Sequence, residues 1–327
     1  MITLKISFLG LGTIGAKLMD YITKNTSTIS KLYDVNIIID KIFVRDITKN
    51  RPIDVSKLCL TTDPYDAIEN ADIVIECLGG NGVELTHELL LSAIQEKKAI
   101  IMSSKKCLAI YGEEIVAAVK EHQTIFHYDA TVGGSIPISS VFETMGKCED
   151  IKKIYGICNG TSNYILNEMN EHNLDYISAL QKAIEKGYAE NNPQEDVDGY
   201  DALYKSIIMV GFGMNQWIKS DQFIPISINT ITNSFIMKAK QNNNLIKPIF
   251  YIEQTEKGIS LFIGPREIQK NTLLATVKEN NNIIIINTSE SRERAFYGQG
   301  AGPKPSACAM YDDLIKTLKE FSHVKHL

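Results

Sequence analysis

The chain has 327 residues, enough for two domains of ordinary size, and its 44% apolar and 22% charged content is typical of a water-soluble globular protein. The formal net charge of −5, with lysine and arginine spread along the chain, argues against a nucleic-acid partner. The opening MITLKISFLG leads directly into a strand and a glycine motif instead of a signal peptide, and no apolar run is long enough to suggest a membrane partner.

The cysteines indicate a reducing compartment. They lie far apart in the sequence and include no C-x-x-C pair. The six are Cys59, Cys77, Cys107, Cys148, Cys158 and Cys308. We therefore expect reduced, mostly buried thiols in a cytoplasmic protein, with neither disulfides nor zinc.

The first predicted element is a buried strand over residues 3–9, followed by GLGTIG at residues 10–15 and then a helix. A G-x-G-x-x-G motif between a strand and a helix is typical of dinucleotide-binding domains. Gly10 allows the tight turn, Gly12 lets the backbone approach a pyrophosphate, and Gly15 lets the helix pack closely on the strand. The motif predicts these cofactor-binding residues: Gly10, Gly12, Thr13, Ile14 and Gly15.

A second predicted strand, residues 42–44, ends in Arg45 and Asp46, with Lys49 close behind. In such domains an acid at this point suits the ribose 2′-hydroxyl of NAD, whereas an arginine suits the 2′-phosphate of NADP. Arg45 and Lys49 favour NADP, and Asp46 leaves NAD open.

Two further apolar strands complete the pattern of a doubly wound α/β sheet. Residues 73–75 lead to Gly79 and Gly80, which we expect to pass beneath the cofactor. Residues 99–102 lead to the pair Lys105–Lys106, and a lysine at the carboxyl end of a parallel strand points into the ligand crevice. We expect helices over residues 85–96 and 113–122 and a last strand over residues 125–128.

The segment DATVGGSIPI, residues 129–138, contains two glycines and a proline and predicts an irregular connection to a second domain. Carbonyl groups beside Asp129 offer oxygen ligands to a hard cation, and a hinge without an ion is the alternative.

The most informative stretch is GYAENNPQEDVDGYDALYK at residues 187–205, which holds five carboxylates and precedes a helical pattern. Asp201 and Lys205 are four residues apart and share one helix face, so Asp201 can orient the Lys205 ammonium as a general acid. A solvated surface ion pair is the alternative. So many acids in one loop also indicate a cationic partner, such as a substrate ammonium group.

The second domain combines helices with antiparallel strands, which predicts an α+β fold. Strands are expected at residues 151–157, 248–253, 259–263 and 283–287, a helix from Tyr164, and loops at the asparagine-rich residues 241–244 and 280–282. We expect a terminal helix over residues 307–321 to pack back on the first domain. The apolar side chains predicted to leave the sheet uncovered, and so to favour a two-fold homodimer, are Ile249, Phe250, Ile252, Leu261, Phe262 and Ile263.

With these motifs in place, the chain resembles the homoserine dehydrogenase family nearly end to end. The similar segments are GLGTIG, ECLGG, DATVGGSIPI, GICNGTSNYIL, GYAENNPQEDVDGYDALYK and YGQGAG. The resemblance implies a Rossmann domain with an α+β catalytic and dimerisation domain. It also implies NAD(P)-dependent interconversion of L-homoserine and L-aspartate 4-semialdehyde in threonine and methionine biosynthesis.

The resemblance also implies roles for individual residues. Lys205 resembles the family's acid/base lysine and Lys105 its second active-site lysine, near the nicotinamide. Glu190, Asp196 and Asp201 are implied to bind substrate, and Gly187 and Gly302 to contact the cofactor. A sodium site is implied at Asp129, Val132, Gly134 and Ile136. The family usually has Glu at position 129 and Asn at position 104, where this chain has Asp129 and Ser104.

The expected organisation is a nucleotide-binding domain over residues 1–132, a catalytic domain over 133–302 and a returning helix over 303–327, without a regulatory domain. Two alternatives remain from the residues alone. One is another amino-acid or semialdehyde dehydrogenase on the same fold, and the other is a non-catalytic NADP-binding sensor.

Overall fold

The computed structural model describes residues 1–80, 82–145, 149–190, 192–290, 292–300 and 302–323. Contacts within the chain divide it into two compact units. The first comprises Met1–Thr131 and the segment from Gly302 onward, and the second comprises Val132–Ala301.

The first unit is built on a six-stranded sheet in the order β3-β2-β1-β4-β5-β6, in which the paired strands are parallel. The strands are β1 (Ile2–Leu9), β2 (Val35–Phe43), β3 (Cys59–Thr61), β4 (Ile73–Glu76), β5 (Ala99–Met102) and β6 (Phe126–His127). Each residue of β4 and β5 is buried, as expected for central strands that helices cover on both faces. The strand order reverses between β1 and β4, and a doubly wound sheet binds its ligand at that point.

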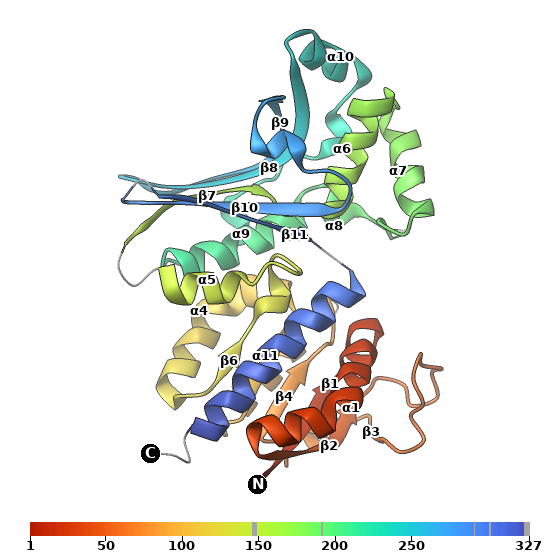
Figure 1. Cartoon of the computed structure of the whole chain (residues 1–327), viewed down its shortest axis with the longest axis vertical. Helices are drawn as coiled ribbons and strands as arrows, with labels where there is room; N and C mark the ends of the chain where they lie inside the picture. Colours follow the sequence, from red (N-terminus) through yellow and green to blue (C-terminus); the bar gives the residue numbers. More distant parts are fainter. Residues whose placement is uncertain (81, 146–148, 191, 291, 301, 324–327) are drawn as a thin grey trace. The chain divides into compact units, whose positions relative to one another are not determined.

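Five helices belong to the described part of this unit, of which α1, α4 and α11 are labelled in Figure 1. They are α1 (Thr13–Tyr33), α2 (Pro64–Ile68), α3 (Val83–Gln95), α4 (Lys105–His122) and α11 (Pro303–His323). Although α11 is distant in sequence, it packs against α1 and β5. Its side chains Ala307, Met310, Leu314 and Leu318 are buried in the same apolar core as Phe8.

The second unit is built on a five-stranded antiparallel sheet in the order β11-β10-β7-β8-β9. The strands are β7 (Ile151–Ile157), β8 (Asn244–Thr255), β9 (Gly258–Gln269), β10 (Asn281–Thr288) and β11 (Glu293–Gln299). The helices are α5 (Ile138–Met145), α6 (Gly160–His172), α7 (Tyr176–Glu185), α8 (Gln194–Val197), α9 (Tyr200–Gly213) and α10 (Asn233–Gln241). Every described residue of α9 from Asp201 to Gly211 is buried, so this helix is a central element of the unit.

The predicted fold class, a Rossmann-like α/β unit with an antiparallel α+β unit, is confirmed, but several element boundaries were wrong. Helix α4 begins at Lys105 instead of residue 113, so the two lysines lie in its first turn. Strand β11 was not predicted, although its pairing with β10 runs from Asn281–Gln299 to Asn287–Glu293. The asparagine-rich tracts are not wholly loops, since Asn244 begins β8 and Asn282 lies within β10.

The six apolar side chains expected to leave the second sheet uncovered are mostly buried within one chain. Ile249, Phe250, Ile252 and Ile263 are 0–7% exposed. Ile249 packs in a cluster with Val277, which follows the short 3₁₀ helix η4 (Leu273–Thr276). The prediction was wrong for these four residues because both faces of the sheet are covered there. Ile249 lies on the face covered by the connection between β9 and β10. Phe250 and Ile252 alternate with Ile249 along β8, and Ile263 pairs with Phe250, so these three lie on the opposite face, where α9 packs against β8.

Candidate functional site

A cavity of about 580 Å³ lies at the carboxyl ends of β1, β2 and β4 in the first unit. Its lining residues include the glycine motif, the loop after β2 and the turn after β4: Gly10, Leu11, Gly12, Thr13, Phe43, Val44, Arg45, Asp46, Lys49, Asn50, Arg51, Pro52, Cys77 and Leu78. The cavity and its lining fit the nucleotide half of a dinucleotide at the point where the sheet reverses.

Two glycines explain why the motif fits a pyrophosphate. Gly10 has φ +101°, and a Cβ there would lie 2.6 Å from the Cys77 carbonyl oxygen, so only glycine is tolerated. Gly12 precedes the first residue of α1, and a Cβ at Gly12 would meet no atom within 4 Å. The N-terminus of α1 therefore faces open space, where its backbone N–H groups and dipole favour an anion.

In the loop after β2, Arg45 is exposed and Asp46 is hydrogen-bonded within the loop. Arg45 is exposed, whereas the Asp46 carboxylate accepts hydrogen bonds from the backbone N–H of Thr48 (2.8 Å) and from its hydroxyl (2.7 Å). These two bonds lower the pKa of Asp46. Arg51 donates back to the loop, with Nη1 2.8 Å from the Lys49 carbonyl oxygen. Asp46, the acid that would suit NAD, is therefore hydrogen-bonded to Thr48 within its own turn.

Glu76 is a buried carboxylate that the sequence analysis missed. It ends β4, and its two oxygens accept backbone N–H groups from Leu78 (2.7 Å), Ser103 (3.1 Å) and Ser104 (2.8 Å). Burial raises the pKa of Glu76, while these three hydrogen bonds act in the opposite direction. The side chain joins the ends of β4 and β5 and thereby sets the start of α4, where Lys105 is the first residue.

In the second unit, Lys205 and Asp201 form a buried ion pair on α9. Lys205 Nζ lies 2.7 Å from Asp201 Oδ2, and the two side chains are only 7% and 3% exposed. The alternative of a solvated surface pair is therefore wrong. Lys205 Nζ also donates to the Cys158 carbonyl oxygen at 2.8 Å. Among the described residues these two acceptors leave the third N–H of the ammonium for a ligand.

The first turn of α6 anchors the acidic loop, and sequence reasoning assigned no role to its residues. Asn159 donates to Asp196 Oδ1 (2.7 Å) and to Asp201 Oδ2 (2.8 Å). Thr161 donates to the Tyr188 carbonyl oxygen (2.6 Å), and the Ser162 hydroxyl donates to the Asp196 carbonyl oxygen (2.9 Å). The run of polar residues directly after a buried strand was the available signal.

The structure brings some of the expected residues of the second unit together and leaves others apart. Lys205, Asp201 and Asp196 form one hydrogen-bonded cluster through Asn159. Glu190 is exposed on the loop, and Gly187 has φ +71° with open space around it. In the first unit, Gly79 and Gly80 are exposed after β4, and Gly302 has φ +128° just before α11.

The residues of the expected sodium site have partners of their own. Asp129 is buried, and Lys316 Nζ of α11 lies 2.7 Å from its Oδ2. In the second unit, Gly134 is buried, and a Cβ there would lie 2.6 Å from the carbonyl oxygens of both Gln299 and Gly300. The Ile136 carbonyl oxygen accepts the Ile138 N–H at 2.8 Å, and Val132 is buried.

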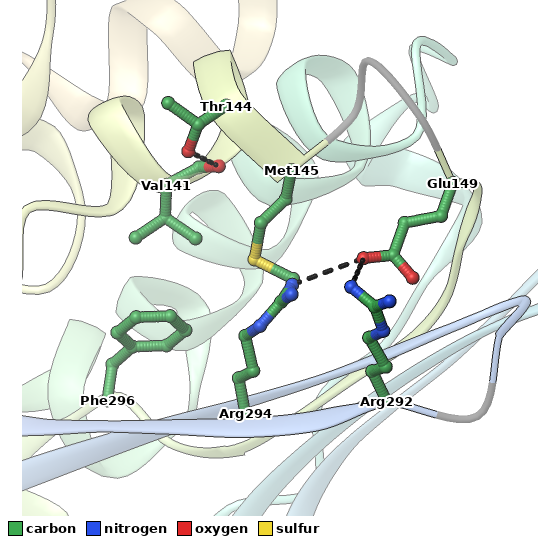
Figure 2. Close-up of a pocket in the computed structure, with 7 residues that line it drawn as sticks. All are labelled: Val141, Thr144, Met145, Glu149, Arg292, Arg294 and Phe296. Carbon is green, nitrogen blue, oxygen red and sulfur yellow. Dashed lines mark hydrogen bonds and ion pairs between the residues drawn. The ribbon is translucent and has the colours of Figure 1, made fainter.

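A second cavity of about 330 Å³ in this unit contains an ion cluster (Figure 2). Arg292 and Arg294 both point at the Glu149 carboxylate, with Nη1 to Oε1 distances of 3.9 and 3.3 Å. The Thr288 hydroxyl also donates to Glu149, at 2.7 Å, and this bond lowers the pKa of Glu149. Because both guanidinium groups are directed at an internal carboxylate, the cluster ties β10 and β11 to the segment after α5.

The described part of the chain tests the expectations about buried thiols and about membrane-spanning segments. Cys59, Cys77, Cys107, Cys158 and Cys308 are not joined in disulfides, and Cys148 lies outside the described residues. Only Cys107 and Cys158 are buried, so the expectation of mostly buried thiols was wrong for Cys59 and Cys308, which are exposed. Among the described helices, none combines the length and the apolar character needed to cross a membrane.

Two family models match the chain. The model described as "Homoserine dehydrogenase, NAD binding domain" matches residues 10–129, and the model described as "Homoserine dehydrogenase" matches residues 137–315. The second alone covers more than half of the chain.

Similar proteins give the same result. The homoserine dehydrogenase of Bacillus subtilis is 31% identical over 321 residues, which are 98% of this chain and 74% of the relative. That of Neisseria gonorrhoeae is 33% identical over 312 residues, 95% of this chain and 71% of the relative. Among solved structures, a homoserine dehydrogenase from Thiobacillus denitrificans superposes with a TM-score of 0.88 at 29% identity, over 97% of this chain and 73% of that one. The S. aureus enzyme at pH 7.0 gives 0.87 at 31% identity, over 98% of this chain and 79% of that one.

Proposed function

The chain belongs to the homoserine dehydrogenase family, and on that premise we propose that Lys205 is the acid/base group of its reaction. The activity itself is the NAD(P)-dependent oxidoreduction of homoserine dehydrogenases, which belongs to amino-acid biosynthesis and acts on an amino-acid semialdehyde. In the reductive direction, Lys205 gives a proton to the aldehyde oxygen of aspartate 4-semialdehyde. In the oxidative direction, it takes the proton from the hydroxyl of homoserine.

The buried Lys205–Asp201 pair is the observation that carries this proposal. Two N–H groups of Lys205 are held by Asp201 Oδ2 and the Cys158 carbonyl oxygen, so the third is directed by the first two. An ammonium held in this way is preorganised, because it does not have to change rotamer to donate to the substrate oxygen. Asp201 orients Lys205 and, with Glu190 and Asp196, provides negative charge for the substrate ammonium.

The cofactor supplies a hydride when bound, and we propose that NADP is preferred over NAD. Arg45 is free to face a 2′-phosphate, whereas Asp46 is engaged by Thr48 and thus less available to a ribose 2′-hydroxyl. A hyperthermophilic archaeal homoserine dehydrogenase mutant has been solved with NADPH. The proposed cofactor-binding residues are Gly10, Gly12, Thr13, Ile14, Gly15, Arg45, Gly79, Gly80, Lys105, Gly187 and Gly302.

A sodium ion fits this chain less well than the family resemblance implies. The Asp129 carboxylate already binds the Lys316 ammonium at 2.7 Å, and that ammonium would repel a second cation at the same carboxylate. We therefore propose that sodium binds only weakly through Asp129, Val132, Gly134 and Ile136. No step of the reaction is assigned to it.

We propose that the chain forms a two-fold homodimer through one face of the second sheet. Tyr155, Tyr251 and Phe262 lie on this face and are only partly buried, and Tyr297 is 59% exposed. Aromatic side chains of this kind favour a protein interface over open solvent. The catalytic and dimerisation domain proposed for residues 133–302 contains this face. We propose residues 1–132 as the nucleotide-binding domain, with residues 303–327 as a helix returning to it. We also propose a cytoplasmic location, which the reduced state of the described cysteines supports.

Lys205→Met tests the acid/base proposal because it keeps most of the buried stem and removes the ammonium. General acid catalysis contributes about 10²–10⁴-fold, so kcat is expected to fall by about 100-fold or more. NADPH binding, followed by cofactor fluorescence, should be unchanged because the glycine motif is untouched. The control is Lys219→Met, an exposed lysine after α9. Near-normal turnover by a folded Lys205→Met enzyme contradicts the proposal.

A further inference from the structure

Asn159 lies at the junction between β7 and α6, and its amide has one possible orientation. The side-chain oxygen accepts the Ser162 backbone N–H at 2.8 Å and so caps α6. A reversed amide would place its NH₂ group against that N–H, donor against donor. The NH₂ group must therefore point away from α6.

The two hydrogens of this NH₂ group each reach a different carboxylate. Nδ2 lies 2.7 Å from Asp196 Oδ1 and 2.8 Å from Asp201 Oδ2. Asn159 and Asp201 are 6% and 2% exposed, so these bonds lie largely out of water, where an ionised carboxylate needs its donors. The amide also separates two like charges, which would otherwise repel each other.

Asp201 Oδ2 is shared between Asn159 and Lys205. The same oxygen accepts Asn159 Nδ2 at 2.8 Å and Lys205 Nζ at 2.7 Å. Lys205 Nζ also donates to the carbonyl of Cys158, the residue before Asn159. Two consecutive residues after β7 therefore hold both members of the ion pair: Cys158 holds Lys205 through its backbone, and Asn159 holds Asp201 through its side chain.

From this arrangement we infer that Asn159 is a positioning residue of the oxidoreductase reaction, which holds Asp201 ionised and aimed at Lys205. In this role Asn159 is assigned no contact with the substrate oxygen or the transferred hydride. Its effect passes through Asp201, whose rotation would release the Lys205 ammonium from its fixed direction. This inference rests on the proposed role of Lys205.

Asn159→Ser is the test, because serine still caps a helix N-terminus but cannot donate to both carboxylates. Loss of a hydrogen bond to a charged group costs about 1.5–3 kcal/mol, so we expect kcat to fall by about 10–150-fold. We also expect the acidic limb of the kcat–pH profile to move to higher pH, because the ionised carboxylate has lost its donor. The KM for NADPH should remain unchanged.

Asn170→Ser is the matched control. Asn170 is a buried asparagine within α6, but its amide bonds only backbone groups. It donates to the Leu166 and Ile246 carbonyl oxygens at 2.5 and 2.8 Å. Its replacement should lower the melting temperature without moving the pH profile. If Asn159→Ser behaves like this control, or keeps normal kcat and pH profile, the inference is wrong.

Asn159→Asp covers the case in which the serine variant does not fold. Aspartate is nearly isosteric and caps a helix equally well, but it places a third carboxylate beside Asp196 and Asp201. We expect a larger loss of kcat than with serine, and wild-type activity would overturn the inference. Lys205→Met separates the two proposals: if Lys205 is essential and Asn159 is silent, only the role of Asn159 fails.

Discussion

Single side chains carry the proposed preference of the first unit for NADP. The exposed Asp46 carboxylate accepts hydrogen bonds from Thr48, and Arg51 donates to backbone carbonyl groups of the same loop. Arg45 is exposed and lines the cavity. Arg45 and Arg51 therefore have different surroundings, although both are basic and only six residues apart in the sequence.

Arg45→Ala is expected to raise the KM for NADPH by about 10–150-fold and to change the KM for NADH little. The reason is that a charge-assisted contact worth about 1.5–3 kcal/mol exists only with the 2′-phosphate. Arg51→Ala is the comparison, because loss of its contacts to the loop should affect both cofactors alike. Steady-state kinetics with each cofactor provide the measurement, and equal changes for both cofactors with Arg45→Ala would exclude a 2′-phosphate contact.

Sequence spacing could predict that Asp201 and Lys205 share a helix face, because that relation is local. It could not predict their burial, since the partner that completes the pair is Cys158, 47 residues from Lys205. Glu76 was missed for the same reason. Two of its three partners are Ser103 and Ser104, which belong to the neighbouring strand end.

Among the elements, α11 is joined to the rest of the first unit by a buried charge cluster as well as by apolar packing. Lys316 Nζ lies 2.7 Å from Asp129 and 3.0 Å from Asp313, whose other oxygen accepts the Asp129 N–H at 2.9 Å. Burial and the neighbouring Asp129 raise the pKa of Asp313 to about 6. Burial lowers the pKa of Lys316, but the hydrogen bond to Asp129 and the charge of Asp313 outweigh this effect and raise it.

Lys316→Met is expected to destabilise the protein by roughly 1.5–3 kcal/mol at pH 8, because two buried carboxylates lose their shared ammonium. The loss should shrink near pH 5, since Asp313 then takes up a proton and the repulsion disappears. The deficit shrinks at low pH, rather than grows, because the pKa of Asp313 in the folded protein is above the ordinary carboxyl value of 3.8. Thermal unfolding at both pH values measures this, with Lys319→Met as an exposed control on the same helix. A deficit that is equal at pH 5 and pH 8 would contradict the coupling.

Element boundaries were predicted best where the apolar pattern was continuous and worst where polar residues begin an element. The Ser-Ser-Lys-Lys run hid the start of α4, which depends on Glu76 instead of a local cap. Strand β11 alternates exposed and half-buried residues at the edge of its sheet, so its only strong signal is the long-range pairing with β10.

At the scale of the whole molecule, the side chains of the second sheet determine where the proposed dimer interface would lie. Four of the six apolar residues expected at an interface are buried in one chain, so the proposed interface uses other side chains of the sheet. Tyr297, Ala295 and Glu293 stand on the same face as Ile283 and Ile285, and all three are exposed. The face is thus formed largely by the strand that sequence analysis did not predict.

Light scattering at micromolar concentration should give a mass near twice 36.5 kDa. Tyr297→Glu is expected to shift the mass toward that of one chain, because a charge would be buried at the two-fold interface. Tyr65→Glu is the control, since Tyr65 is a comparably exposed tyrosine (50%) of the first unit. A wild-type mass of one chain with full activity would exclude the dimer.

The contribution of α11 to the first core also has a consequence for biosynthesis. A ribosome makes β1 to β6 first, then the whole second unit, and only afterwards the helix that carries Ala307, Met310, Leu314 and Leu318. Throughout translation of the intervening segment, the nascent nucleotide-binding unit lacks the apolar side chains with which α11 covers α1 and β5. Chaperones that recognise exposed apolar surface therefore meet this unit for longer than they would meet a Rossmann unit encoded in one continuous stretch.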